Sequence, residues 1–181
     1  MYKIPLEIVV PIYNEGDKVI KLLEEFKNHI KINFRVLLCY DHLDDNIFDY
    51  KDCFDKFDFK IVLVKNLSVG PGSAIKTGMF FGNSDCVIVY PADDFLNINI
   101  IDKMYNSFKD GNDIVVASRF IKGGSMKGCP ILKSILVRLA SSTLYLLSSI
   151  PVKDASNGFR LFSRKLLNIG EIEAKVGFAY S

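Results

Sequence analysis

Four polar segments of this sequence each follow an apolar run of strand length. They are Asn14-Glu15, Asp41, Asp93-Asp94 and Ser118-Arg119. Carboxylates can hold a divalent cation, and an arginine can donate charge-assisted hydrogen bonds to phosphate oxygens. If these segments meet in the fold, they suit a phosphate-bearing substrate that a divalent cation bridges to the protein.

Apolar runs and helical segments alternate along the chain. Strands are expected at Leu6–Val10, Phe34–Tyr40, Phe59–Val64, Cys86–Tyr90, Ile114–Ala117 and Phe159–Phe162. Helices are expected at Val19–Ile30, about 46–56, Ser73–Phe81, 98–109 and Leu132–Ile150, and a glycine-rich loop at 121–130. Strands that are apolar on both faces and separated by helices predict an α/β fold with a mostly parallel sheet. Ligands of such sheets bind beyond the carboxyl ends of the strands, where the four polar segments would lie.

Composition and charge limit the class of protein. The 181 residues, 49% apolar and 24% charged, fit one folded domain and exclude a disordered chain. The net charge of +2 makes no general demand for nucleic acid. Residues 41–58 nevertheless carry a net charge of −5, and residues 119–165 carry nine Lys or Arg against Asp154 alone. This basic half indicates an anionic ligand or surface.

The cysteines do not indicate a metal site. None of the four forms a CxxC pair, and the chain has two histidines, so a zinc site of the usual spacing is not expected. Cys39 and Cys86 lie in apolar runs and are expected to be buried thiols in a reducing compartment. The N-terminus does not resemble a signal peptide, and the stretch Ile131–Val152 is too polar for a membrane span.

Each polar segment also has a purely structural interpretation. Asn14-Glu15 could cap the helix that follows, and Asp93-Asp94 followed by Asn97 could do the same before residues 98–109. Gly70-Pro71-Gly72 could simply form a turn, and the acidic residues of 41–58 could form a solvated face. The functional interpretation depends on several such segments sharing one edge of the sheet.

Five motifs in this order resemble family 2 glycosyltransferases with the GT-A fold. They are IVVPIYNE near the N-terminus, NLSVGPGSAIKTG from Asn66, VIVYPADDF at the position of the family's Asp-x-Asp metal motif, VVASRF, and DASNGFRLFSR from Asp154. The last resembles the corresponding stretch of dolichyl-phosphate mannosyltransferase-like members. The resemblance extends over nearly the whole chain and implies a single GT-A (Rossmann-like) catalytic domain over residues 1–181. It also predicts that further sheet elements and any membrane anchor lie beyond Ser181.

The resemblance implies an enzyme that moves a sugar from a nucleotide diphosphate-sugar, such as a UDP- or GDP-sugar, with inversion at the anomeric carbon. The residues that match nucleotide-binding positions are Pro11, Tyr13, Asn14, Glu15, Asp41, Gly70, Gly72 and Asp93. Asp93 matches the second acid of the metal motif and would hold Mg²⁺ or Mn²⁺ against the developing diphosphate charge. The candidate catalytic residues are Asp94, as the available base, and Arg119 and Arg160, near the diphosphate or the acceptor.

Two segments depart from the family pattern. Where the family reads Asp-Asp-Gly-Ser after the second strand, this chain has Tyr40-Asp41-His42-Leu43, which leaves the identity of the base open. Where the family reads Asp-Ala-Asp, this chain has Pro91-Ala92-Asp93, so the first acid of the metal motif is missing.

Polyprenyl-phosphate sugar transferases are the members that the chain most resembles, which implies a lipid-phosphate acceptor at the cytoplasmic face of a membrane. Two alternatives stay open. The acceptor could be a cell-surface saccharide, or the chain could be a catalytically silent nucleotide-sugar-binding protein, as Pro91 and Tyr40 suggest.

The expected helix Leu132–Ile150 has an unusual distribution of side chains. Its polar residues form one narrow stripe, at Ser134, Arg138, Ser141, Tyr145 and Ser148, and the rest of its circumference is largely apolar. Such a helix is either buried on nearly every side or exposes apolar residues to lipid. The basic surroundings favour anionic headgroups, so we predict a peripheral contact with the membrane interface.

Overall fold

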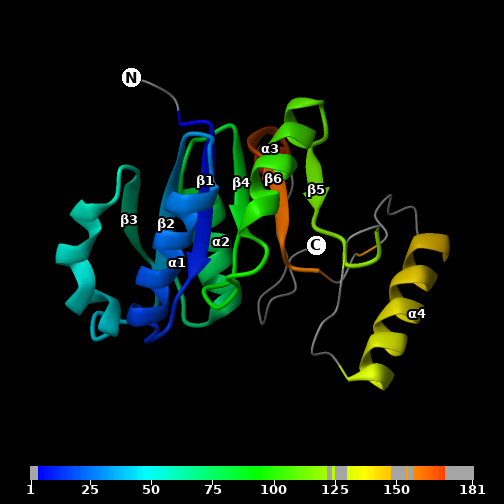
Figure 1. The fold of residues 1–181 in the computed structure, drawn as a ribbon, viewed down its shortest axis with the longest axis horizontal. Coiled ribbons are helices and arrows are strands. Elements are labelled where there is room, and N and C mark those ends of the chain that lie inside the picture. Colours follow the sequence, from blue (N-terminus) through cyan, green and yellow to red (C-terminus); the bar gives the residue numbers. More distant parts are fainter. Residues whose placement is uncertain (1–3, 122–123, 125–129, 148–153, 155–156, 170–181) are drawn as a thin grey trace.

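The alternating pattern folds into a sheet with helices on both faces (Figure 1). The structure is a computed structural model, and it describes residues 4–121, 124, 130–147, 154 and 157–169. Within these residues the sheet consists of β1 (Leu6–Pro11), β2 (Phe34–Tyr40), β3 (Lys60–Lys65), β4 (Cys86–Val89), β5 (Ile114–Val116) and β6 (Arg160–Ser163). The strand order is β3-β2-β1-β4-β6-β5.

The sheet is mostly parallel, as the sequence predicts. Strands β1 to β4 pair in parallel, whereas β6 is antiparallel to both of its neighbours, β4 and β5. Strand β5 therefore runs in the same direction as β1 to β4. Five strands end at one edge of the sheet, which we call the carboxyl edge, and β6 begins there.

The helices lie close to their expected positions. They are α1 (Gly16–His29), the 3-10 helix η1 (Asn46–Lys56), α2 (Pro71–Phe81), the 3-10 turn η2 (Ile98–Ile100), α3 (Ile101–Lys109), α4 (Ile131–Leu147) and α5 (Arg164–Ile169). The expected helix at 46–56 is thus a 3-10 helix. Residues 148–150 of the expected helix Leu132–Ile150, and most of the glycine-rich loop 121–130, lie outside the described residues.

Two apolar layers cover the two faces of the sheet. On one face Ile8, Val10 and Leu38 pack with buried residues of α1 and α3, such as Phe26 and Met104. On the other face a second set of strand residues packs with α2 and α5: Val9, Leu37, Cys39 and Val87. Helix α2 approaches closely because it has glycine at position 78, where a Cβ would collide with the Val9 side chain. Cys39 and Cys86 are buried free thiols, as expected, and burial raises the pKa of each to about 12.

A buried ion cluster closes the opposite, amino edge of the sheet. The Glu7 carboxylate is fully buried and accepts hydrogen bonds from Arg35, from Arg164 at 2.8 Å and from the Ser84 hydroxyl at 2.7 Å. Gly82 lies so close that a Cβ there would meet the carboxylate. Burial lowers the pKa of Arg164, and the charge of Glu7 opposes that shift.

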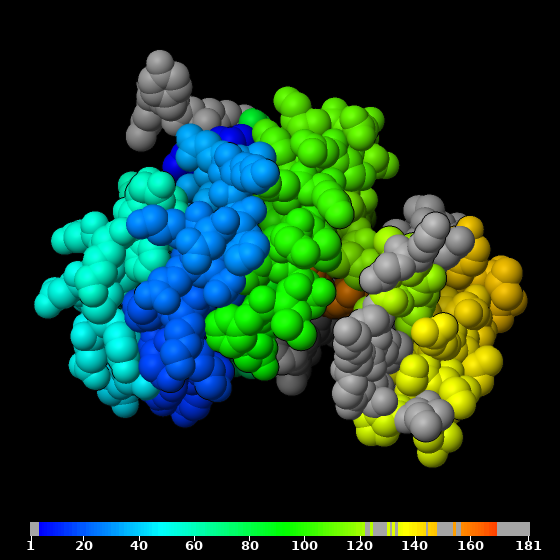
Figure 2. Space-filling view, viewed as in Figure 1, coloured from blue at the N-terminus to red at the C-terminus, as the bar shows by residue number. Residues whose placement is uncertain are grey.

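Helix α4 lies apart from the layered body, beyond β5 and β6 (Figures 1 and 2). Its outward side chains Leu132, Leu139, Leu146 and Leu147 are 60–83% exposed, whereas Ser141 is buried. The interpretation of a helix buried on nearly every side is therefore wrong. Ser141 of the polar stripe is thus covered while these four leucines are exposed, because the helix stands beside the sheet instead of covering it. None of the described helices is both long enough and apolar enough to cross a membrane.

Candidate active site at the carboxyl edge

The loop after β1 and the loop after β2 hold each other in place. Asn46 Nα donates to the Asn14 side chain at 3.2 Å, and Gly16 Nα donates to the Asn46 side chain at 2.9 Å. The buried Asp45 carboxylate accepts from Asn14 Nα at 2.9 Å and from Ile47 Nα at 2.9 Å. Asn14 adopts a positive φ of 53° within this network. The capping interpretation of Asn14-Glu15 is therefore wrong, because the start of α1 is capped by Asn46 from the neighbouring loop.

Asp41 organises the loop between β3 and α2. Its carboxylate accepts from the Asn66 side chain at 2.7 Å and from Gly70 Nα at 3.0 Å. Gly70 has φ of 107°, a conformation that side-chain-bearing residues rarely adopt, so glycine is needed at this turn. Gly72 lies in the first turn of α2, half-buried. Asp41 thus holds Gly70 of the expected nucleotide site, and its contact with the base stays a prediction.

Asp93 and Asp94 follow β4 but differ in what they contact. Asp94 accepts from Leu96 Nα at 2.9 Å, from Asn97 Nα at 3.1 Å and from the Asn97 side chain at 2.7 Å. These bonds close the turn at residues 94–97, whereas neither η2 nor α3 has a side-chain cap at its start, so the capping interpretation of this segment is wrong. Asp93 is exposed and makes no hydrogen bond or ion pair within the described part of the chain. The Asp93 carboxylate is therefore the one in this turn that a ligand can reach without breaking a contact.

Arg119 is held by a buried carboxylate that the sequence analysis did not assign to the site. Its guanidinium donates to Asp154 Oδ2 at 2.8 Å and to Oδ1 at 2.6 Å, and its backbone N–H donates to Oδ2 at 2.9 Å. Asp154 is fully buried and is the single acidic residue of the basic segment 119–165, which was the available signal. Arg160 begins β6, and its Nε donates to the Asn157 carbonyl at 2.7 Å.

A cavity of about 700 Å³ opens between β4, β5, the start of β6 and α3. Three residues proposed from the sequence line it: Pro11, Asp94 and Arg119. Residues that the sequence did not single out also line it, among them Lys103, Asn157 and Phe159. The cavity is not lined by the remaining predicted residues, which are Tyr13, Asn14, Glu15, Asp41, Gly70, Gly72, Asp93 and Arg160. The carboxyl edge therefore has two halves, a network around Asp41 and Asn14 and a cavity beside Arg119.

Tyr90 lies beneath the Asp94 turn. Its ring is fully buried and packs edge-on against Phe26, at 5.3 Å between centroids, and against Phe159, at 4.8 Å. Its hydroxyl is buried without a hydrogen-bond partner of good geometry in the part of the chain that the structure describes. Burial raises the pKa of Tyr90 strongly, and the nearby charge of Asp94 adds to the shift.

The site offers a divalent cation one protein carboxylate. Among the described residues, no group of three or more Asp, Glu, His or Cys side chains is close enough together to form a metal site. Mg²⁺ and Mn²⁺ sites often need one or two carboxylates, because waters and substrate phosphates complete the shell. The exposed Asp93 fits a cation that is held jointly with a diphosphate.

Solved structures with the same arrangement are nucleotide-sugar transferases. Glucosyl-3-phosphoglycerate synthase from Mycobacterium tuberculosis, in complex with Mn²⁺, UDP and glucosyl-3-phosphoglycerate, matches 91% of this chain and 58% of its own, with a TM-score of 0.63 and 15% identity. A mannosyltransferase from Pyrobaculum calidifontis, in complex with GDP-mannose and Mn²⁺, matches 98% of this chain and 50% of its own, with a TM-score of 0.60 and 16% identity. These likenesses confirm the GT-A fold.

Curated proteins that are similar in sequence are also sugar transferases. The dolichol-phosphate mannosyltransferase of Pyrococcus furiosus is 22% identical over 177 residues, which cover 96% of this chain and 50% of the relative. A dolichyl-phosphate β-glucosyltransferase of Trichomonas vaginalis is 25% identical over 174 residues, covering 88% and 53%. The chain thus spans about half the length of these relatives. The model of the family described as glycosyl transferase family 2 matches residues 7–170, and with its motifs and fold in agreement, the chain belongs to that family.

Proposed function

We propose that this chain is the catalytic domain of an inverting glycosyltransferase that moves a sugar from a nucleotide diphosphate-sugar to a polyprenyl phosphate. The observation that carries the proposal is the cavity at the carboxyl edge, where the Asp94 turn and the Asp154-held Arg119 face the same space. The named activities of the relatives support the acceptor class.

The donor nucleotide is assigned to the half of the edge around Asp41. Pro11, Tyr13, Asn14 and Glu15 lie in or beside the loop braced by Asn46, and Gly70 and Gly72 lie in the loop braced by Asp41. Both loops are fixed by hydrogen bonds before any ligand binds, which lowers the ordering cost of binding. The exposed Tyr13 ring is available to contact the base.

Charge at the diphosphate is assigned to Asp93, Arg119 and Arg160. A Mg²⁺ or Mn²⁺ ion bound between Asp93 and the diphosphate would neutralise charge on the departing nucleoside diphosphate. Arg119 is oriented by two hydrogen bonds to Asp154, so its remaining N–H groups have a fixed direction. Such preorganised donors stabilise developing negative charge without reorganising during the reaction.

The demand for a base favours a phosphate acceptor. Asp94 already accepts three hydrogen bonds from Leu96 and Asn97, so its oxygens are engaged within the protein and are poorly placed to take a proton from an acceptor hydroxyl. A saccharide hydroxyl needs a base to remove its proton, whereas a phosphate monoester is already ionised and attacks directly. The anomeric carbon then forms a bond to the acceptor oxygen as its bond to the diphosphate breaks on the opposite face.

Helix α4 is assigned a peripheral contact at the membrane interface. Its leucines Leu132, Leu139, Leu146 and Leu147 are exposed, and the surrounding segment 119–165 is strongly basic. Cys39 and Cys86, which the sequence predicts to be thiols of a reducing compartment, and the nucleotide-sugar donor support a place at the cytoplasmic face. Sedimentation with anionic vesicles should show binding that weakens with salt, and no binding by the folded chain at low salt would refute this contact.

A calorimetric titration tests the donor and metal assignments together. UDP- and GDP-sugars with Mn²⁺ should bind the parent, and Asp93→Asn should bind with no dependence on Mn²⁺. The matched control is Asp52→Asn, an exposed carboxylate on η1, which should behave like the parent. Binding of nucleotide and metal by Asp93→Asn at parental affinity would remove Asp93 from the site.

A catalytically silent nucleotide-sugar-binding domain is the second candidate. It is favoured by Pro91 in place of an acid and by the local hydrogen bonds that occupy Asp94. Such a domain would bind the donor without metal dependence and would show neither donor hydrolysis nor transfer.

A further inference from the structure

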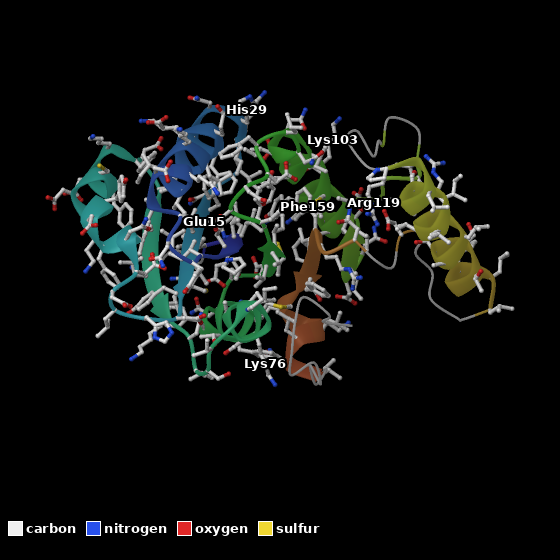
Figure 3. The ribbon with its side chains drawn as sticks, turned by 90° about the horizontal axis from the view of Figure 1, so that it is seen from below. Glu15, His29, Lys76, Lys103, Arg119 and Phe159 are labelled. Atoms are coloured by element: carbon white, nitrogen blue, oxygen red, sulfur yellow. The ribbon has the colours of Figure 1, made fainter. Side chains whose placement is uncertain are left out.

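The cavity beside Arg119 contains a second cation whose charge is not neutralised by a neighbour. Lys103 lies in the first turn of α3 and lines the cavity together with Arg119 and Phe159 (Figure 3). Arg119 shares its charge with the buried Asp154. Lys103 makes no hydrogen bond or ion pair within the part of the chain that the structure describes. Lys103 therefore offers an anionic ligand in this cavity a positive charge that no carboxylate among the described residues pairs with.

The surroundings of Lys103 are amphiphilic. The neighbouring walls are apolar, formed by Ile100, Met104, Val115 and Phe159. A low-dielectric wall strengthens the attraction between a cation and an anion beside it, compared with the same pair in open solvent. The cavity thus suits a ligand with a charged head and an apolar stem.

Lys103 lies in the half of the carboxyl edge that is away from the expected nucleotide-binding residues. The cavity lies between α3 and β5, and it does not include Tyr13, Asp41 or Gly70 from the nucleotide half. Strand order separates the two halves, since β3, β2 and β1 precede β4 while β6 and β5 follow it. The base and ribose of the donor therefore lie away from Lys103, which leaves the donor diphosphate and the acceptor as the anions that it can face.

We propose that Lys103 binds the phosphate of the acceptor, a phosphate monoester, and is a substrate-contacting residue of this active site. That this phosphate belongs to the sugar acceptor rests on the proposed function. The binding of a phosphate monoester at Lys103 can be measured without any sugar transfer. The phosphate monoester could belong to a lipid, such as a polyprenyl phosphate, or to a water-soluble molecule, such as glycerol phosphate.

The test compares three variants of the full chain. Lys103→Gln removes the charge, Lys103→Arg keeps it, and Lys109→Gln is the matched control at the other end of α3, outside this cavity. Binding of a short-chain, water-soluble polyprenyl phosphate is measured by calorimetry, and binding of UDP or GDP is measured in parallel. Thermal unfolding verifies that each variant folds.

The expected result is a loss of about tenfold or more in polyprenyl-phosphate affinity for Lys103→Gln, with nucleotide affinity unchanged. Lys103→Arg should regain most of the affinity, and Lys109→Gln should equal the parent. Where transfer is detected, the acceptor KM should rise with little change in donor KM.

Glycerol phosphate distinguishes the two sources of the anion. Clearly stronger binding of the polyprenyl phosphate than of glycerol phosphate, lost in Lys103→Gln, supports a lipid acceptor, and equal Lys103-dependent binding of both supports a soluble one. Phosphate binding that is unaffected by Lys103→Gln, or a loss of nucleotide affinity instead, overturns the assignment. Lys103-dependent phosphate binding without any transfer would leave Lys103 in place and refute the proposed activity.

Discussion

Two buried carboxylates mark opposite edges of the sheet and illustrate two uses of the same ion pair. Glu7, at the amino edge, is enclosed by Arg35 and Arg164, whose side chains are 16% and 14% exposed. Asp154, at the carboxyl edge, is held by Arg119, which is 29% exposed and lines the cavity. Both carboxylates are fully buried. What separates a structural pair from a candidate catalytic pair is therefore where the arginine's remaining surface points.

The largest effect is expected at the amino edge. Glu7→Ala leaves two buried arginines without their carboxylate, and breaking a buried pair in this way costs about 3–5 kcal/mol of unfolding free energy. Urea unfolding measures the loss, with the exposed Glu24→Ala on α1 as the control. If Glu7→Ala lay within about 1 kcal/mol of the parent, the cluster would not stabilise the fold.

Arg119→Lys is expected to separate function from stability at the carboxyl edge. Lysine keeps the positive charge but cannot form both side-chain hydrogen bonds to Asp154. The charged group is then no longer oriented toward the cavity. We expect transfer to fall by about 100-fold, while unfolding free energy falls by about 1–2 kcal/mol.

Arg35→Lys is the matched exchange at the amino edge. It should lower stability and leave the transfer rate of the folded protein unchanged, because Arg35 contacts Glu7 far from the cavity. Full transfer activity in Arg119→Lys, or lost activity in folded Arg35→Lys, would erase the distinction between the two edges.

Asp41→Ala tests the nucleotide half. We expect donor binding to weaken by about 1–3 kcal/mol, because Asn66 and Gly70 lose their acceptor and the loop before α2 is no longer fixed. Nucleotide titration measures the change, and the exposed Asp44→Ala in the same loop is the control. An unchanged affinity would remove Asp41 from the site.

The sequence predicted the sheet and its functional edge because both depend on local patterns. Apolar runs such as Phe34–Tyr40 indicate strands, and the rule for parallel sheets then brings the segments after them to one edge. Asp94 and Arg119 do share a cavity there. The reversed direction of β6 was not predictable, because a strand's side-chain period is the same in both directions.

Long-range polar contacts account for most of what the sequence could not predict. Asp154 and Arg119 are 35 positions apart, and Asn14 and Asn46 are 32 apart, so no local spacing pairs them. Lys103 resembles any solvated lysine on a helix until the cavity is known. The periodicity of α4 showed a polar stripe but could not show that Ser141 is buried while Leu139, Leu146 and Leu147 are exposed.

The smallest effect is expected from Tyr90→Phe, which removes a buried hydroxyl group. The hydroxyl has no partner of good geometry among the described residues, while the ring contacts with Phe26 and Phe159 would be kept. We expect unfolding free energy at neutral pH to stay constant or rise by up to about 1 kcal/mol.

The raised pKa of Tyr90 gives a second readout. Above pH ~10 the unfolded tyrosine ionises while the folded one does not, so the parent loses stability that Tyr90→Phe retains. Tyr105→Phe on α3, whose hydroxyl is less deeply buried, is the control. A loss above about 1 kcal/mol in Tyr90→Phe would mean that the hydroxyl bonds to Asp94 and supports the carboxyl edge.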